Sequence, residues 1–448
     1  MKRFGYLFPA VISLTFAVEC LGKSLYQDGT VQFAREADAN STDANAPVTL
    51  PDYLRLAALN NAGLKAAFEE WKAAVEQVPQ ARALPDPRFT YAYYIQEIET
   101  RVGPQKNRLG IMQLFPWFGE IEARADAAAA AAKAARQRYE AAKLKLFFQV
   151  KDAFHEYVYL ASAVQIAKDN LELIKHFEEV ARTKYIAAAA GHPDVIRAQM
   201  ELAKLEDHVK TLEDLRNPIV ARLNAVLNRA DFTMLAWPRR QEFQHTPVQR
   251  SRVIAILKAQ NPQLQELDFE VQSSRSALEA AKKKFYPNMG VGVDWIDTGD
   301  RSGVRDGGTD AVILMFTMDL PIWRKSYKAA EMQAEANVRK ARQQRIETEN
   351  TILARTERVL YDFEDSSRKV GLYADVLVPK AKELLSVSET AYKGGTVDFL
   401  SLIDAQRMLL GYQLNYERSV TDNLQRLAEL EMLAGTELSS ADSAAAAQ

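Results

Sequence analysis

The sequence predicts a mainly α-helical protein with a small β part, built from long antiparallel coiled-coil helical hairpins and four β-strands. Three observations lead to this prediction: an internal duplication, apolar residues at coiled-coil spacing over very long segments, and short alternating segments ahead of each long helix. The composition agrees, because alanine is abundant while the 448 residues include only 19 glycines and 16 prolines. Such a mix favours helix over the many-turned all-β classes.

The duplication relates two halves of the chain, and the matching residues keep their order while the offset grows from 200 to 207 residues. The matches are Asn61 with Asn261, Leu64 with Leu264, Ala81 with Ala281, Pro87 with Pro287, Pro116 with Pro321, Tyr185 with Tyr392, and Ala198-Gln199 with Ala405-Gln406. We therefore predict a first structural repeat over residues 51–250 and a second over residues 251–435. Each is expected to have the order helix, strand, strand, long helix, long helix.

Each half contains two segments that alternate as half-buried strands do. We predict strands at Arg88–Ile95, Leu109–Phe115, Met289–Ile296 and Ala311–Leu320, joined by polar loops at Gln96–Asn107 and Asp297–Asp310. One face of the first strand carries Phe89, Tyr91, Tyr93 and Ile95, and the third strand sets Met289, Val291, Val293 and Trp295 opposite Gly290, Gly292 and Asp294. An apolar, aromatic face opposite a small or polar face suits a strand between lipid and water. A soluble hairpin that covers a core is the alternative.

The helices are predicted from apolar residues spaced alternately three and four apart, which is the coiled-coil seam. In the first half this series runs Val150, Ala153, Tyr157, Leu160, Val164, Ala167, Leu171 and Ile174. A helix from near Gly119 to about Ala188 would extend on the order of 100 Å. A shorter helix is expected ahead of the strands in each half, Leu54 to about Leu84 and Val253 to about Phe285. Pro379 lies inside the second long helix and predicts a kink or break there.

The N-terminal residues 1–22 are typical of a secretory signal peptide. Lys2 and Arg3 precede a mostly apolar run, Phe4 to Val18, that is too short for an ordinary transmembrane helix. Two alternatives stay open. One is an N-terminal helix that is never cleaved, and the other is lipidation of Cys20, which Glu19 disfavours because a lipobox needs a small residue there. Residues 23–50 are predicted to be a linker and residues 436–448 a disordered tail.

The sequence shows no clustered enzyme or metal site, so we expect neither enzymatic activity nor a cofactor. The five histidines have no i, i+4 pairing and no cysteine partners, and no nucleotide-binding or serine-hydrolase motif occurs. The 57 lysines and arginines nearly balance 59 aspartates and glutamates, which gives no pull toward nucleic acid. The run Lys282–Lys284 is most often a solvated helix end, with a membrane-surface contact as the alternative.

The turns at the far ends of the two predicted hairpins carry acidic residues: Asp194, beside Arg197, in the first, and Asp398 and Asp404 in the second. If identical chains pack around an axis, an inward carboxylate becomes a ring that narrows and polarises a pore. Helix capping is the other interpretation. Capping is favoured for Asp194, which directly follows a His-Pro pair, and the pore is favoured for Asp404, one turn inside a helix.

On these features the chain resembles the outer-membrane efflux protein family, the TolC type, over about residues 50–435. The resemblance rests on the duplicated element order, on Leu114–Gly119 and Leu320–Trp323 after the second strand of each half, and on Pro379, Tyr392, Gly395 and Asp404-Ala-Gln. It implies a homotrimer in the cell outer membrane, with four strands from each subunit in one twelve-stranded transmembrane barrel and the helices forming a tunnel in the periplasm. It also implies a periplasmic adaptor (membrane fusion) protein, an inner-membrane RND or ABC transporter, and outer-membrane lipid as partners.

In this family a tyrosine, an arginine and two aspartates at the second hairpin end constrict the aperture. Here Tyr392 matches the tyrosine and Asp404 the inner aspartate, whereas Val397 stands in place of the arginine and Ser401 in place of the other aspartate. The resemblance therefore implies a periplasmic aperture at Tyr392, Asp404 and Ser401 with a looser closure, or one that uses Asp194 of the first hairpin.

The residues themselves also favour association of several copies. Four strands cannot close around a lumen, and each unpaired backbone group at a sheet edge in lipid costs several kcal/mol. We therefore predict a passive exit duct for small molecules, metal ions or proteins, and the resemblance implies that it belongs to a tripartite efflux or type I secretion system with a separate pump. The alternative is a periplasmic coiled-coil scaffold or adaptor-type binding protein without a barrel, which would have no use for aromatic-faced strands in both halves.

Overall fold

The computed structural model describes residues 49–229, 234–238 and 243–438. The chain divides into two units, Met1–Pro47 and Val48–Gln448, and all described residues belong to the second unit. The predicted signal peptide, Cys20, and most of the predicted linker and tail lie outside the described residues.

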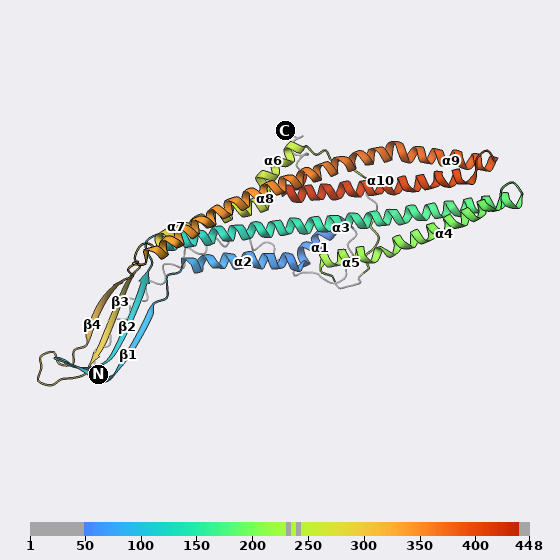
Figure 1. Cartoon of the computed structure of the whole chain (residues 1–448). Coiled ribbons are helices and arrows are strands. Elements are labelled where there is room, and N and C mark those ends of the chain that lie inside the picture. The colour runs from blue at the N-terminus through green and yellow to red at the C-terminus, as the bar shows by residue number, and fades with distance from the viewer. Residues whose placement is uncertain (1–48, 230–233, 239–242, 439–448) are drawn as a thin grey trace. The chain divides into compact units, whose positions relative to one another are not determined.

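The two halves of the described chain repeat one order of elements (Figure 1). The helices of the first half are α1 (Leu50–Asn60), α2 (Ala62–Arg82), α3 (Glu120–Ile186), α4 (His192–Asp214) and α5 (Arg216–Leu227). Those of the second half are α6 (Arg250–Gln260), α7 (Pro262–Lys283), α8 (Arg324–Leu372), α9 (Val378–Gly394) and α10 (Phe399–Ala434). The predicted mainly α-helical fold, with long helical hairpins and a few strands, is confirmed.

The helix ahead of the strands in each half is broken in two, which the sequence analysis did not predict. Asn61 and Asn261 both adopt an extended backbone and cap the following helix by accepting a hydrogen bond from the N–H of the residue three positions later. Each side-chain amide also donates to a distant carbonyl, that of Val226 at 2.9 Å and that of Leu433 at 2.8 Å. These long-range hydrogen bonds fix the break at the same place in both repeats.

Helix α3 is the central helix of the helical part and contacts helices of both repeats. Its 67 residues correspond to about 100 Å of helix, as predicted. It packs against α2 and α7 toward one end and against α4 and α10 along the rest (Figure 1). The predicted seam is confirmed, because every residue of the series from Val150 to Ile174 is buried except Leu171, which is partly buried at the edge of two apolar clusters.

At Pro379, where the sequence predicts a kink or break, a π-helical turn, Tyr373–Leu377, lies between α8 and α9. Proline has no N–H to donate within a helix, and its ring crowds the carbonyl of the residue four positions earlier. The wider turn directly before Pro379 absorbs both effects while the helix continues to Gly394.

The strands form a single antiparallel sheet in the order β1-β2-β3-β4. Their bounds are β1 (Arg88–Thr100), β2 (Gly103–Phe115), β3 (Met289–Thr298) and β4 (Ala311–Met318). The two halves of the chain therefore meet at the β2–β3 pair, and β1 and β4 lie at the edges.

The predicted loop Gln96–Asn107 is wrong, because β1 and β2 run through most of it and only Arg101 and Val102 lie between them. The Thr100 hydroxyl donates to the Gly103 carbonyl at 2.6 Å across this turn. The apolar alternation stops at Ile95, and a register shift lies between Tyr93 and Ile98. Backbone pairing continues without an apolar face, which is why the residue pattern did not reveal it.

Candidate pore aperture and membrane-facing sheet

The far ends of the two hairpins share one apolar core. Ile174 and Phe177 of α3, Val195 of α4, and Phe399 and Leu402 of α10 are buried together there. This core holds the α3–α4 turn and the α9–α10 turn next to each other. The residues predicted to form an aperture lie on and around it.

Tyr392 is buried between the two hairpins, with only 3% of its surface exposed. Its ring packs against Phe399, with 5.3 Å between ring centroids, and the Lys184 ammonium lies 4.5 Å from the ring centroid. Lys184 also donates to the Tyr392 backbone carbonyl. The phenol oxygen has no hydrogen-bond partner among the described residues. Burial, and then the nearby charge of Asp194, raise the pKa of Tyr392 to about 12.

Asp398 caps α10. Its carboxylate accepts hydrogen bonds from the Ser401 backbone N–H at 3.0 Å and from the Ser401 hydroxyl at 2.6 Å. These hydrogen bonds lower the pKa of Asp398. Within one subunit, therefore, the hydroxyl of Ser401 serves the cap.

Asp194 lies in the first turn of α4, but the capping position belongs to Gly191 and no side chain caps this helix. The capping interpretation of Asp194 is wrong for that reason. Its carboxylate instead lies 3.6 Å from the Arg197 guanidinium, and a negative charge in the first turn also suits the helix dipole.

Asp404 belongs to a charged group that links the two hairpins. Arg407 of α10 lies 3.4 Å from the Asp404 carboxylate and donates to Glu201 of α4 at 3.1 Å. The Asp404 side chain stays 54% exposed. Hydrogen bonds from Arg407, and secondarily from Lys204, lower the pKa of Glu201. Neither Arg407 nor Glu201 is among the residues predicted from the sequence. The spacing of Asp404 and Arg407, three residues apart on a helix, was the available signal.

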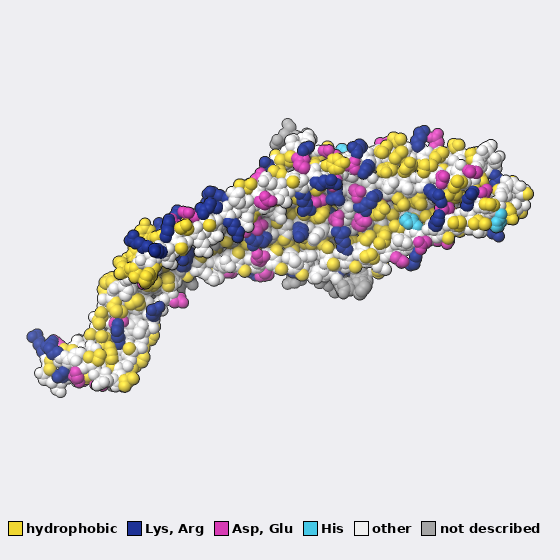
Figure 2. All heavy atoms as spheres, in the orientation of Figure 1, with side chains coloured by type: hydrophobic (Ala, Val, Ile, Leu, Met, Phe, Trp, Pro, Cys, Tyr) yellow, Lys and Arg dark blue, Asp and Glu magenta, His cyan; other side chains and the backbone are white. Residues whose placement is uncertain are grey.

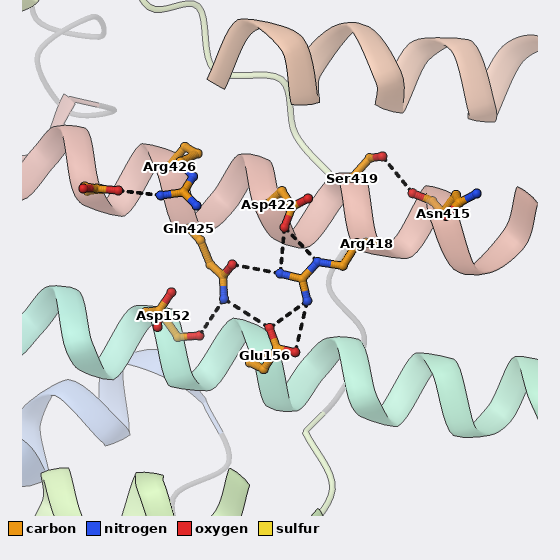
Figure 3. A network of polar contacts seen from close by, with 9 residues as sticks. Asp152, Glu156, Asn415, Arg418, Ser419, Asp422, Gln425 and Arg426 are labelled. Carbon is orange, nitrogen blue, oxygen red and sulfur yellow. Dashed lines mark hydrogen bonds and ion pairs between the residues drawn. The ribbon is translucent and has the colours of Figure 1, made fainter. Parts of the chain in front are cut away.

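A second polar group joins the two repeats farther along α3 and α10 (Figure 3). Arg418 of α10 lies 2.8 Å from Glu156 of α3 and 2.7 Å from Asp422, one turn along its own helix. Gln425 donates to the Asp152 backbone carbonyl at 3.1 Å. Hydrogen bonds and ion pairs need more specific distances and angles than apolar contacts do. These contacts therefore favour one register of α10 along α3 over the alternatives.

The sheet has one exposed apolar face. Its neighbouring residues pair across the strands as Phe89 with Ile111, Leu109 with Trp295, and Val293 with Leu314. Most of this face is exposed, namely Phe89, Tyr91, Tyr93, Ile111, Val293, Val312, Leu314, Phe316 and Met318. The predicted apolar faces of the separate strands thus merge into one surface.

The opposite face of the sheet mixes glycine and polar residues with apolar ones such as Met112 and Ile313, and it carries an ion pair. Asp294, 2% exposed, pairs with Arg108 on the neighbouring strand. Gly110 lies beside this pair, and a Cβ there would lie too close to the Asp294 carboxylate. A face with glycines and an ion pair opposite an exposed apolar face suits strands with water on one side and lipid on the other.

Across residues 49–229, 234–238 and 243–438, no helix combines the length and apolarity that a membrane span needs. Over those same ranges, no group of three or more histidine, cysteine, aspartate or glutamate side chains is placed to hold a metal ion.

Comparison with known proteins gives consistent results. Residues 53–229 and 253–436 match the family described as outer membrane efflux protein. Nodulation protein T of Rhizobium leguminosarum bv. trifolii is 22% identical over 416 residues, covering 88% of this chain and 87% of that protein. The cobalt-zinc-cadmium resistance protein CzcC of Cupriavidus metallidurans is 21% identical over 406 residues, covering 88% and 91%. The outer-membrane channel OprN has the same fold, with a TM-score of 0.74 at 17% identity over 86% of this chain and 89% of that chain.

The matched segments cover the helices and strands of both repeats. Members of this family are trimeric channels, not enzymes, and they work with adaptor and inner-membrane pump partners. The chain belongs to the outer membrane efflux protein family, and it is an outer-membrane protein whose helical part lies in the periplasm.

Proposed function

We propose that three copies of this chain form the outer-membrane exit duct of a tripartite efflux system. Cargo would enter from an adaptor and an inner-membrane pump and pass through passively. Residues 51–250 and 251–435 would act as two structural repeats, each giving two strands to a twelve-stranded barrel and one hairpin to the periplasmic tunnel.

The observation that carries this proposal is the open sheet. β1 and β4 are edge strands, and the sheet exposes a continuous apolar face. Unpaired backbone groups at such edges cost several kcal/mol each in lipid. Pairing β1 of one copy with β4 of the next would satisfy both edges, and closure of the ring would bring the face with Arg108 and Asp294 to the inside.

The proposed periplasmic aperture comprises Tyr392, Asp404, Ser401 and Asp194. Asp404 is its charged member, because the carboxylate is more than half exposed although Arg407 lies beside it. The Tyr392 ring supports the neighbouring backbone through its contacts with Phe399 and Lys184. Closure here would depend on the contacts between Arg407 and Glu201 and between Lys184 and Tyr392 within each subunit.

The names of the relatives suggest two cargo classes. One relative is a cobalt-zinc-cadmium resistance protein and the other a nodulation protein. We propose metal ions or small molecules as cargo on this basis. The alternative function, a periplasmic scaffold or adaptor-type protein without a barrel, gains nothing from the exposed apolar sheet face.

Conductance across planar lipid bilayers tests the duct. Purified protein should give discrete channels, and Asp404→Ala should weaken channel block by divalent cations about tenfold, because a ring of carboxylates is lost from the narrowest part. Asp214→Ala removes a charge at the opposite end of α4 and is the matched control. Membrane insertion without channels would refute the duct, whereas channels with unchanged cation block would refute only the role of Asp404.

A further inference from the structure

Four basic residues gather where the helices of the second repeat meet the sheet. Lys283 and Lys284 end α7, and Arg324 and Lys325 begin α8. None of these four side chains has an ion pair or hydrogen bond to another described residue. The acids in the same helix ends are already paired, Glu279 with Lys282 and Glu331 with Lys328, both at 2.8 Å. No ion pair among the described residues therefore neutralises these four charges.

The first repeat provides an internal comparison. At the offsets of 200 and 205 residues that relate the repeats, the four basic residues match Ala83, Leu84, Gly119 and Glu120. None of these is basic. These four positions therefore carry positive charge only in the second repeat, whereas the first repeat places Arg124 at its junction, where it donates to the Ala81 carbonyl at 2.9 Å. Arg324 and Lys325 also lie at the N-terminal end of α8, where the helix dipole disfavours cations. Their charge does not serve the helix.

Large apolar side chains lie next to this basic cluster. Leu320, Ile322 and Trp323, between β4 and α8, are 69%, 67% and 74% exposed. Where the helices meet the sheet, Tyr286, between α7 and β3, also stacks on Trp117, with 5.0 Å between ring centroids and 10° between the ring planes. In Figure 2 the hydrophobic surface of this junction carries a row of Lys and Arg side chains along α7 and α8. Exposed tryptophan beside lysine and arginine is typical of the boundary between lipid tails and headgroups.

We propose that Lys283, Lys284, Arg324 and Lys325, with Trp323, form a binding surface for anionic phospholipid headgroups in the periplasmic leaflet. The surface continues directly from the apolar sheet face, so its occupant is lipid, and the unpaired positive charge selects a headgroup with net negative charge. A trimer would present three such surfaces around the barrel. This inference rests on the membrane placement in the proposed function and extends it to a lipid preference.

The test uses the full-length protein in vesicles that contain a small fraction of brominated phosphatidylglycerol or, separately, brominated phosphatidylcholine. Bromine quenches nearby tryptophan, and the difference in signal between wild type and Trp323→Phe isolates Trp323. Half-maximal quenching of Trp323 should need a mole fraction of brominated phosphatidylglycerol at least about fivefold lower than that of brominated phosphatidylcholine. A single basic group near an anionic surface already gives a preference of this size. Raising the salt from 0.1 to 1 M should abolish the difference, because the Debye length falls to about 3 Å.

The charge-removing variant changes all four basic residues to glutamine. Its control changes Lys65, Lys340, Arg342 and Lys382 to glutamine, four exposed cations that lie in other parts of the helices and carry the same total charge. In the charge-removing variant, both lipids should quench Trp323 equally. In the control variant, phosphatidylglycerol should still quench Trp323 at the lower mole fraction, as in wild type. A wild type without preference, or a charge-removing variant that keeps it, overturns the proposal. If neither lipid quenches Trp323 and no channels form, the membrane placement itself is wrong.

Discussion

A buried histidine in the helical part has a strongly lowered pKa. His155 of α3 is 6% exposed and lies one turn from Lys151. Burial, and then the charge of Lys151, lower the pKa of His155 to about 4. The imidazole is therefore neutral in the folded protein at neutral pH, although the same histidine in an unfolded chain would titrate near pH 6.5.

This difference predicts acid sensitivity. Between pH 6.5 and 4 the unfolded chain binds a proton that the folded chain does not, so stability falls as the pH falls through that range. Between pH 7 and pH 4, the unfolding free energy of wild type should fall by about 3 kcal/mol more than that of His155→Leu, because leucine does not bind a proton. Urea unfolding of the detergent-solubilised protein at both pH values measures it. His176→Leu, at a half-exposed site, is the control, and identical pH dependence of His155→Leu and wild type would contradict the account.

The candidate aperture shows how far single residues can be predicted. Asp404 is predicted from its place one turn inside a helix and its match to a family position, and the structure leaves its carboxylate exposed. The partner Glu201 lies 206 residues away in sequence from Arg407, so no local pattern pairs them. The burial of Tyr392 was equally hidden, because it depends on Phe399 and Lys184 meeting across two hairpins.

At the scale of elements, periodic patterns located the helices and strands well and their ends less well. The α3 seam and the four strands follow from spacing alone. The breaks at Asn61 and Asn261 do not, because the helical pattern continues through them and hydrogen bonds to Val226 and Leu433 decide the backbone. The outer parts of β1 and β2 do not follow from spacing for a related reason, because backbone hydrogen bonds pair them without an alternating apolar face.

The π-helical turn at Tyr373–Leu377 offers a test at this scale. Replacing Pro379 with alanine restores an N–H and removes the ring clash, so the turn should return to regular α-helix and stability should rise by about 1 to 3 kcal/mol. Hydrogen exchange of the peptide covering residues 373–379 should slow. Pro262→Ala is the matched control, since a proline at the start of α7 removes no helical hydrogen bond. Unchanged exchange at 373–379 would show that the neighbouring packing, and not proline, sets the turn.

At the scale of the whole molecule, a single subunit leaves its sheet unfinished. The chain buries its helical cores internally, yet two strand edges and one apolar face stay open. The need for further copies could be predicted from the sequence, because four strands are too few to close around a lumen. The contacts between copies could not be predicted, because the repeat pattern within one chain does not indicate which residues of neighbouring chains pair.

Cysteine cross-linking between edge strands tests the central claim, that β1 of one copy pairs with β4 of the next. Ala92→Cys on β1 is combined in turn with Ile313→Cys, Met315→Cys or Thr317→Cys on β4, all on the same face of the sheet, in a Cys20→Ser background. Within one chain three strand spacings, about 14 Å, separate these edges, which is too far for a disulfide. Tyr91→Cys, on the opposite face, is the control.

At least one pair should give covalent trimers on oxidation in membranes, and the Tyr91→Cys control should not. Membrane-inserted protein that stays monomeric with every pair would contradict the account.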